Sequence, residues 1–240
     1  MERIIDFHSH ILPGIDDGSR SPEESLAMLR MLWEQGIRHV VATPHFYPQH
    51  DTPEHFLQRR AQAESALRQA MAGQRDLPKV SIGAEVYFFN GISNSDAMWE
   101  LTIDRTEYLL LEMPMPPWKD GVYRELESLY RKQGLIPIIA HVDRYLGRFR
   151  TYGIPERLAR LPVLVQANAE FFTKRSTSSM AMRMLRQKQI HLLGSDCHNL
   201  SSRSPNLGKA LEIIEKRTEK NTLDLIQNWQ RRVLPERDHL

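Results

Sequence analysis

Side chains of the types that bind metal ions recur along this sequence, and the densest group is the segment DFHSH at residues 6–10. His8 and His10 are two residues apart, so on an extended chain both imidazoles point to the same side and can aim at one ion. Further histidines and acids each follow an apolar run later in the chain: His45, Glu85, Glu112, His141, Asp196 and His198.

This ligand set offers imidazole nitrogen and carboxylate oxygen without thiolate, which suits Mn²⁺, Fe²⁺ or Zn²⁺ and does not choose among them. The set is larger than one ion needs. We therefore expect a multinuclear site in which a carboxylate such as Glu85 bridges metals. Closely spaced metals stabilise the attacking and leaving oxygens of a phosphoryl displacement and generate hydroxide near neutral pH.

Two arginines lie close to candidate ligands, Arg144 in HVDRY and Arg203 in SDCHNLSSR. A guanidinium presents a planar fork that matches phosphate oxygens. Each arginine alone is equally well explained by an ion pair with a neighbouring acid. Beside a metal cluster, the two together favour an anionic substrate.

The only cysteine, Cys197, precedes Arg203 with the C-x5-R spacing of the cysteine-dependent phosphatases. Their loop wraps backbone N–H groups around phosphate and usually needs glycine, but the intervening HNLSS has none. If Asp196 and His198 both face metals from an extended strand end, Cys197 points the other way. We interpret the spacing as a coincidence and expect the thiol to pack against the barrel wall.

Seven short apolar runs alternate with segments of helical spacing, which predicts an α/β fold with a parallel sheet. The crossovers of such a sheet either close it into a barrel or leave it open and doubly wound. In a barrel the strand ends converge on one mouth, whereas an open sheet spreads them along an edge. Because every run ends in polar or metal-ligand residues, we predict a barrel. The runs are 3–7, 37–43, 79–85, 107–112, 135–141, 162–168 and 190–196.

The composition is that of an ordinary globular chain of 240 residues, with 41% apolar and 26% charged residues, and predicts a single domain over 1–240. The formal charge of +2, with interspersed basic residues, argues against a nucleic-acid partner. One cysteine and an N-terminus without a signal-peptide pattern indicate the cytoplasm. The longest apolar runs fall far short of the ~20 residues of a membrane span, so we expect no membrane insertion.

The ordered motifs DFHSH, TPH, GAE, LLE, IAH and SDCH resemble those of the polymerase and histidinol phosphatase (PHP) superfamily, from Asp6 to about Arg203. Within it, HSHILPGIDDGSRSPEES, IAHVDRY and SDCHNLSSR look like the bacterial manganese-dependent protein-tyrosine phosphatases of capsule and exopolysaccharide operons. The resemblance implies a distorted (β/α)7 TIM-like barrel of the PHP type. It also implies three Mn²⁺ ions, with Fe or Zn as other possible occupants.

Carried over by position, the resemblance places Asp17 where it orients water or acts as an acid, and places Arg144 and Arg203 on the phosphate. The implied reaction is hydrolysis of phosphotyrosine by a metal-bound hydroxide. The implied substrate is the tyrosine-rich tail of a bacterial tyrosine kinase that regulates capsule or exopolysaccharide synthesis. The implied metal ligands form three groups: His8, His10, Glu85 and Asp196; Glu85, Glu112 and His141; and His45 with His198.

Three other functions compete with this one. A histidinol phosphatase or another PHP phosphoesterase would use the same metals, although DDGSRSPEES favours the tyrosine enzymes. The near-neutral charge weighs against a polymerase-associated exonuclease. The complete ligand set weighs against a non-catalytic adaptor of a kinase.

Two loops follow candidate ligands and raise the question of substrate contact. Residues 114–121, PMPPWKDG, come soon after Glu112, and their prolines favour a rigid connector over a substrate-contacting loop. In the segment 45–51, Phe46 or Tyr47 is a candidate to stack on a substrate ring.

Overall fold

The computed structural model describes residues 4–147, 152–218 and 221–235 of the chain. Its strands all pair in parallel and form two hydrogen-bonded sets. The first set, in order of pairing, is β1 (Ile5–Ser9), β2 (His39–Ala42) and β4 (Lys79–Ile82). The second is β3 (His45–Phe46), β5 (Glu85–Tyr87), β6 (Tyr108–Glu112), β7 (Ile136–Ile139), β8 (Leu164–Asn168) and β9 (Leu192–Gly194).

The two sets join into one curled sheet because β2 and β4 are each followed closely by a second short strand. β2 continues into β3 across Thr43 and Pro44, and β4 continues into β5 across Gly83 and Ala84. Pro44 has no N–H group to donate to a ladder, which accounts for the first break. In the part of the chain that the structure describes, the runs 37–43 and 79–85 each lead into a second strand, and the other five runs each match one strand.

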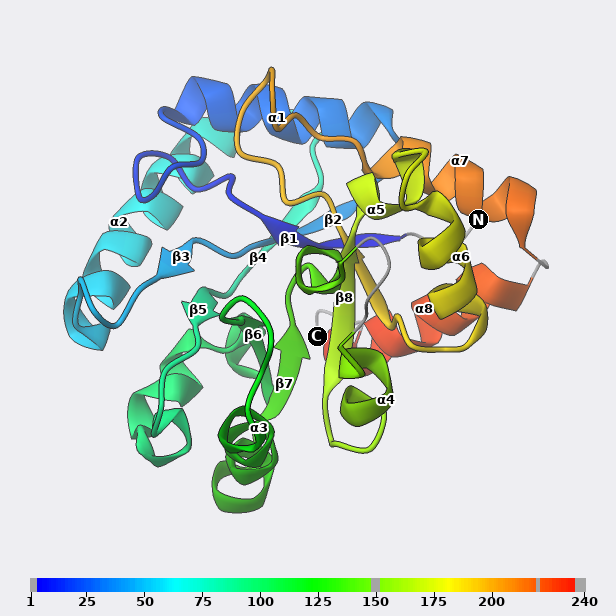
Figure 1. Cartoon of the computed structure of the whole chain (residues 1–240). Coiled ribbons are helices and arrows are strands. Elements are labelled where there is room, and N and C mark those ends of the chain that lie inside the picture. Colours follow the sequence, from blue (N-terminus) through cyan, green and yellow to red (C-terminus); the bar gives the residue numbers. More distant parts are fainter. Residues whose placement is uncertain (1–3, 148–151, 219–220, 236–240) are drawn as a thin grey trace.

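The ring of strands is completed between β1 and the segment that follows β9. Asp196 donates its backbone N–H to the His8 carbonyl over 2.8 Å, and His10 donates to the Cys197 carbonyl over 2.9 Å. These bonds bring the first and last strands of the sheet together. Figure 1 shows the curled arrangement of the strands. The predicted α/β class and the distorted barrel are confirmed, and the open doubly wound sheet is excluded.

Helices surround the strands on the outside of this ring (Figure 1). Short 3₁₀ turns in the described ranges accompany them, η1 (Ile92–Asn94), η2 (Asp96–Leu101), η3 (Ile103–Arg105) and η4 (Val142–Tyr145). The α-helices are α1 (Pro22–Glu34), α2 (Pro53–Met71), α3 (Asp120–Gln133), α4 (Ile154–Leu158), α5 (Ala169–Thr173), α6 (Ser178–Arg186), α7 (Leu207–Arg217) and α8 (Asn221–Val233).

Helix α1 illustrates how the local sequence fixes these elements. The Ser21 side chain accepts a hydrogen bond from the Glu24 N–H, and Pro22 occupies the first helical position, where a missing N–H costs nothing. Met28, Leu29 and Leu32 lie on one face of the helix and are fully buried. The helix is therefore started by its cap and held by its apolar stripe.

The strand residues that face one another inside the ring are apolar along most of their length and polar at one end. On β6, Tyr108, Leu110 and Glu112 share one face. Tyr108 and Leu110 belong to a buried cluster with Phe7, Ile138 and other strand residues, whereas Glu112 stands at the carboxyl end of the strand. The interior of the ring is therefore apolar along most of its length and polar at the carboxyl ends of the strands. Among the described residues, no helix combines the length and the apolar character needed to cross a membrane.

Candidate metal centre

All eight predicted metal ligands come together at the carboxyl ends of the strands. Their donor atoms form four interlocking groups, in each of which one nitrogen or oxygen per residue lies within 4.8 Å of the others. The groups are His8, His10 and Asp196; His8, Glu85 and His141; His45, Glu85 and Glu112; and His10, Asp17, His45 and His198.

The first group joins β1 to the segment after β9. His8 Nε2 lies 3.1 Å from His10 Nε2, and each of these nitrogens lies 3.5 Å from Asp196 Oδ1. The two imidazoles thus face the same side, as their spacing predicts. Asp196 reaches them from a left-handed backbone conformation, with φ of 53°, so it does not sit on an extended strand.

Glu85 occupies the middle of the cluster and is fully buried. One carboxylate oxygen lies 2.7 Å from His141 Nε2, and the other lies 3.1 Å from both His8 Nε2 and His45 Nδ1. Glu85 therefore contacts imidazoles on three sides, which is the position that a bridging carboxylate needs. Glu112 is more peripheral, 3.8 Å from His45 Nδ1 and 3.9 Å from His141 Nε2.

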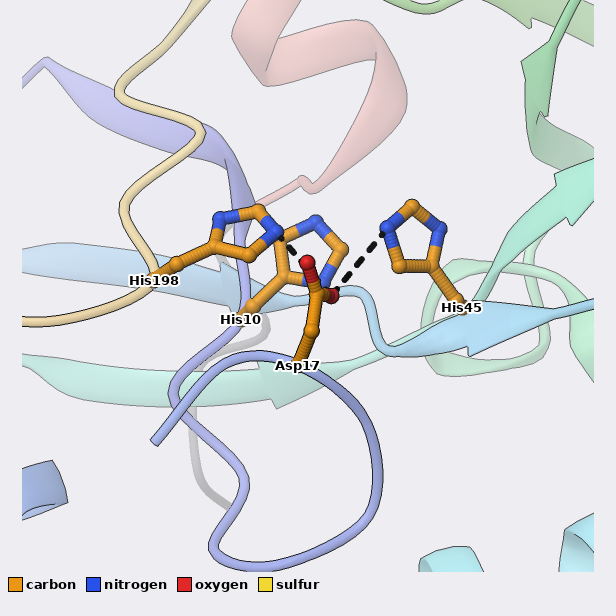
Figure 2. A group of neighbouring side chains, drawn as sticks. All are labelled: His10, Asp17, His45 and His198. Carbon is orange, nitrogen blue, oxygen red and sulfur yellow. Dashed lines mark ion pairs between the residues drawn. The ribbon is translucent and has the colours of Figure 1, made fainter. Parts of the chain in front are cut away.

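The fourth group adds Asp17 to three histidines (Figure 2). Asp17 comes from the loop after β1, and its Oδ1 lies 3.4 Å from His198 Nε2 and 3.6 Å from His45 Nε2. Its side chain is 65% exposed, so it closes the cluster on the solvent side. The resemblance gives Asp17 a role toward water or a proton, whereas its position in the structure also suits a metal ligand.

Asp16 is a supporting residue that the sequence analysis missed. Its Oδ2 accepts hydrogen bonds from His10 Nδ1 over 2.8 Å and from the His45 backbone N–H over 3.0 Å. Its Oδ1 accepts from the Gly18 N–H. The bond to Nδ1 fixes the tautomer of His10 so that Nε2 faces the cluster, a common arrangement for metal-binding histidines. The repeated acid in DDG was the available signal.

Gln166 supports the other side of the cluster from β8. Its Oε1 accepts from the His141 backbone N–H over 2.6 Å and lies 3.3 Å from His8 Nδ1. Its Nε2 donates to Asn168, and Asn168 in turn donates to Asp196 Oδ2 over 2.9 Å. This chain of amides links ligands from three strands.

Both arginines bind Asp196 in this structure. Arg203 donates to Asp196 Oδ1 over 2.9 Å, and Arg144 donates to Oδ2. Arg203 also lies 3.5 Å from Asp17. The ion pairs that the sequence left as an alternative are thus present, but the arginine side chains keep 38% and 36% of their surface exposed. They line a pocket of about 340 Å³ at the edge of the cluster, where their remaining N–H groups are accessible to an anion.

The electrostatics of the cluster reflect many charges in a buried space. Burial by itself lowers the pKa of His10, but the nearby carboxylates of Asp16 and Glu85 outweigh it and raise the pKa to about 10. Burial by itself raises the pKa of Glu85, and the surrounding His8 and His141 hold it well below its ordinary value. The buried carboxylate of Glu85 is therefore negatively charged and favours positive charge around it.

The donor set fits divalent metal ions. The Nε2 atom of His198 is buried without a hydrogen-bond partner, and so is Nδ1 of His45. Each points into a group that contains carboxylate oxygens. Unpaired buried nitrogens of this kind carry a desolvation cost that a bound ion removes. Nitrogen and oxygen donors at these positions suit Mn, Fe or Zn.

Cys197 lies outside this cluster. The residue has no exposed surface and belongs to the apolar core beneath the helices, and burial raises the pKa of its thiol far above the ordinary value. A thiolate nucleophile needs the opposite environment, exposed and electropositive. The structure thus supports the interpretation of C-x5-R as a coincidence.

The match to a family model decides which proteins this chain resembles as a whole. The model described as "Capsular polysaccharide synthesis, CpsB/CapC" matches residues 4–233. The chain belongs to the CpsB/CapC family. This confirms the resemblance to the bacterial phosphatases of capsule operons that the motifs indicated.

Curated relatives of the CpsB/CapC family carry the name tyrosine-protein phosphatase. CpsB of Streptococcus pneumoniae is 28% identical over 229 residues, which cover 89% of this chain and 90% of the relative. YwqE of Bacillus subtilis (strain 168) is 30% identical over 224 residues, covering 89% and 84%.

Solved structures share the fold. A crystal structure from the pair YwqE of B. subtilis and CpsB of S. pneumoniae, described as unique metal-dependent tyrosine phosphatases, matches with a TM-score of 0.80 at 24% identity. The match covers 98% of this chain and 96% of the other. A phosphotriesterase homology protein from Escherichia coli matches more distantly, with a TM-score of 0.52 at 13% identity over 93% and 95% of the two chains.

Proposed function

We propose that this CpsB/CapC protein is a manganese-dependent protein-tyrosine phosphatase. Its substrate is the phosphotyrosine tail of a bacterial tyrosine kinase that regulates capsule or exopolysaccharide synthesis. The chain acts in the cytoplasm as a single metallophosphatase domain over residues 1–240. The observation that carries the proposal is the convergence of all eight candidate ligands on one cluster, in a chain whose curated relatives are named tyrosine-protein phosphatases.

Three Mn²⁺ ions would be shared among the four donor groups. His8, His10 and Asp196 would hold one. Glu85, His141 and Glu112 would hold a second, since Glu85 and Glu112 both approach His141 Nε2, at 2.7 and 3.9 Å. The third would lie among the remaining donors, His45, His198 and Asp17. Metal ions bound there supply Lewis acidity to phosphoryl oxygens and lower the pKa of water.

The arginines bind the phosphate, and buried polar residues hold the metal ligands in position. Arg144 and Arg203 converge on Asp196 from the rim, so a phosphate that bridges the cluster meets two guanidinium groups. Their planar forks hold its oxygens and stabilise the charge that builds up on them during transfer. Gln166 and Asp16 keep the imidazoles in place, so that little reorganisation is needed.

The leaving group makes modest demands on these residues. Tyrosinate has an ordinary pKa near 10, so it departs with less proton donation than an alkyl alcohol requires. Asp17 is 65% exposed and lies beside His45 and His198, and in this proposal its carboxylate orients water or carries a proton when it does not bind the third metal. Tyr47 lines a second pocket, of about 420 Å³, on the Asp17 side of the cluster. Phe46 is excluded as a stacking partner because it is buried in the core.

A substrate comparison tests this proposal. Purified protein with Mn²⁺ is assayed on a phosphotyrosine peptide, the matching phosphoserine peptide and histidinol phosphate. We expect the highest kcat/KM on phosphotyrosine and loss of activity with EDTA. Equal or better turnover of histidinol phosphate would move the assignment to the histidinol phosphatases, and bound metal without hydrolysis of any phosphoester would support an adaptor.

A further inference from the structure

A groove of about 930 Å³ opens on the loops that follow β5 and β6, at the same end of the strands as the metal centre. Its lining combines exposed apolar surface with basic side chains. Met115 is 71% exposed, more than any other large apolar residue that the structure describes, and Lys119 and Arg124 are exposed beside it. The remaining lining includes Gln49, Phe88, Phe89, Pro114, Pro117 and Trp118.

The groove is tied to the metal centre through Tyr145. The Tyr145 hydroxyl accepts a hydrogen bond from the Met113 N–H over 2.7 Å, and the ring lies 5.6 Å from the His141 ring and 5.1 Å from that of Trp118. Trp118 donates its indole N–H to the Pro114 carbonyl, which closes the loop on itself. The loop is therefore a preformed wall.

The groove also lies within reach of a peptide bound at the metals. Met115 is three residues from the ligand candidate Glu112, so their Cα atoms are at most ~11 Å apart. An extended peptide covers that distance in three to four residues. A side chain a few positions from a phosphotyrosine at the metal centre therefore falls on this surface.

The charge of the groove selects among peptides. Lys119 and Arg124 form no ion pair with any residue that the structure describes. Asp120 is the single acid in the lining, and it is already paired with Arg157 over 2.7 Å. Asp120 also lies close enough to Arg124 to offset part of its charge, so the lining keeps a net positive charge next to Met115.

We propose that this groove binds the residues that flank the phosphotyrosine and selects an acidic segment with apolar side chains. The proposal rests on the function proposed above, because only a phosphatase of polypeptides needs such a surface. Apolar side chains of the substrate pack on Met115 and Phe89, and its carboxylates face Lys119 and Arg124. Attraction between opposite charges speeds the encounter, and this effect weakens with salt.

The test compares a long substrate with a short one. The long substrate is a peptide of about ten residues with a central phosphotyrosine flanked by glutamates and leucines, and the short one is p-nitrophenyl phosphate. The variant carries Lys119→Glu and Arg124→Glu, and a second variant carries Met115→Asp. Arg75→Glu is the matched control, because Arg75 is an exposed arginine just before β4, at the opposite end of the strands.

We expect the ratio of kcat/KM on the peptide to that on p-nitrophenyl phosphate to fall about tenfold in both groove variants, through KM. It should stay at the wild-type value in Arg75→Glu. We also expect Met115→Leu to keep the wild-type ratio. An unchanged ratio in both groove variants would overturn the proposal, and this includes the case in which kcat/KM falls equally on both substrates.

A peptide-binding measurement distinguishes an error in the groove proposal from an error in the proposed function. Fluorescence anisotropy of the same peptide, labelled and with tyrosine in place of phosphotyrosine, reports on the groove without catalysis. If the wild type hydrolyses no phosphotyrosine, the proposed function is wrong. In that case, weaker binding by the groove variants than by Arg75→Glu still supports the groove, and equal binding overturns it.

Discussion

Gly194 is the residue whose replacement most directly tests how the fold positions the metal ligands. It is the last residue of β9 and lies between β1 and β8. A Cβ atom added there would lie 2.6 Å from His8 Cβ and 2.7 Å from Gln166 Nε2. Ordinary carbon contacts are ~3.5–4.0 Å, so the neighbours would have to separate by about 1 Å.

The expected cost of Gly194→Ala has two parts. Overpacking of a buried site destabilises a protein by about 1–3 kcal/mol. In addition, both displaced residues orient ligands, since Gln166 Oε1 bonds the His141 backbone and approaches His8 Nδ1. Disturbing such supporting contacts lowers metal affinity by about 10–100-fold.

Urea unfolding in EDTA measures the first part, and competition for Mn²⁺ with a chromophoric chelator measures the second. Gly121→Ala serves as control, because a Cβ there meets only Arg124 at an ordinary 3.9 Å. If Gly194→Ala bound Mn²⁺ as tightly as the wild type, the close packing of His8 against β9 would not position the ligand, and the reasoning would be refuted.

Two further perturbations follow from the same structure. Asp16→Asn should lower Mn²⁺ affinity about 10–100-fold by removing the carboxylate that accepts from His10 Nδ1, with partial recovery in Asp16→Glu; metal analysis after dialysis checks both. Burial lowers the pKa of His191 to about 4, so the side chain is neutral in the folded protein above that pH. In the unfolded chain it binds a proton below its ordinary pKa of 6.5. The free energy of unfolding therefore decreases as the pH falls from about 6.5 to about 4. At pH 5 the wild type should therefore lose about 2 kcal/mol more than His191→Gln relative to pH 7, measured by urea unfolding in EDTA; parallel loss in both proteins would contradict this.

The convergence of the candidate ligands could be predicted from the sequence because these residues follow the strands directly. A residue such as Glu112 follows an apolar run directly, and the barrel brings all such ends to one mouth, so position in the chain predicts position in space. The second run was predicted to end at residue 43, and the short strand β3 beyond Pro44 was missed. Asp16 was missed because it lies in a loop, where residue spacing does not predict which way a side chain points.

Other parts of the molecule could not be predicted because they depend on tertiary contacts. The short turns η1 to η3 between β5 and β6 have no helical pattern long enough to detect. The loop 114–121 was interpreted as a rigid connector. Its hydrogen bonds support rigidity, but Met115 and Lys119 also line a groove, which only the three-dimensional arrangement shows.

The measurement that tests the account most directly is phosphotyrosine-peptide hydrolysis by the wild type, Cys197→Ala and His8→Ala, each with Mn²⁺ and with EDTA. The buried Cys197 and the central position of His8 predict that Cys197→Ala keeps its activity, while EDTA and His8→Ala abolish it. An inactive Cys197→Ala variant together with a wild type that is indifferent to EDTA would contradict the account, because a thiolate and not a metal centre would then carry the reaction.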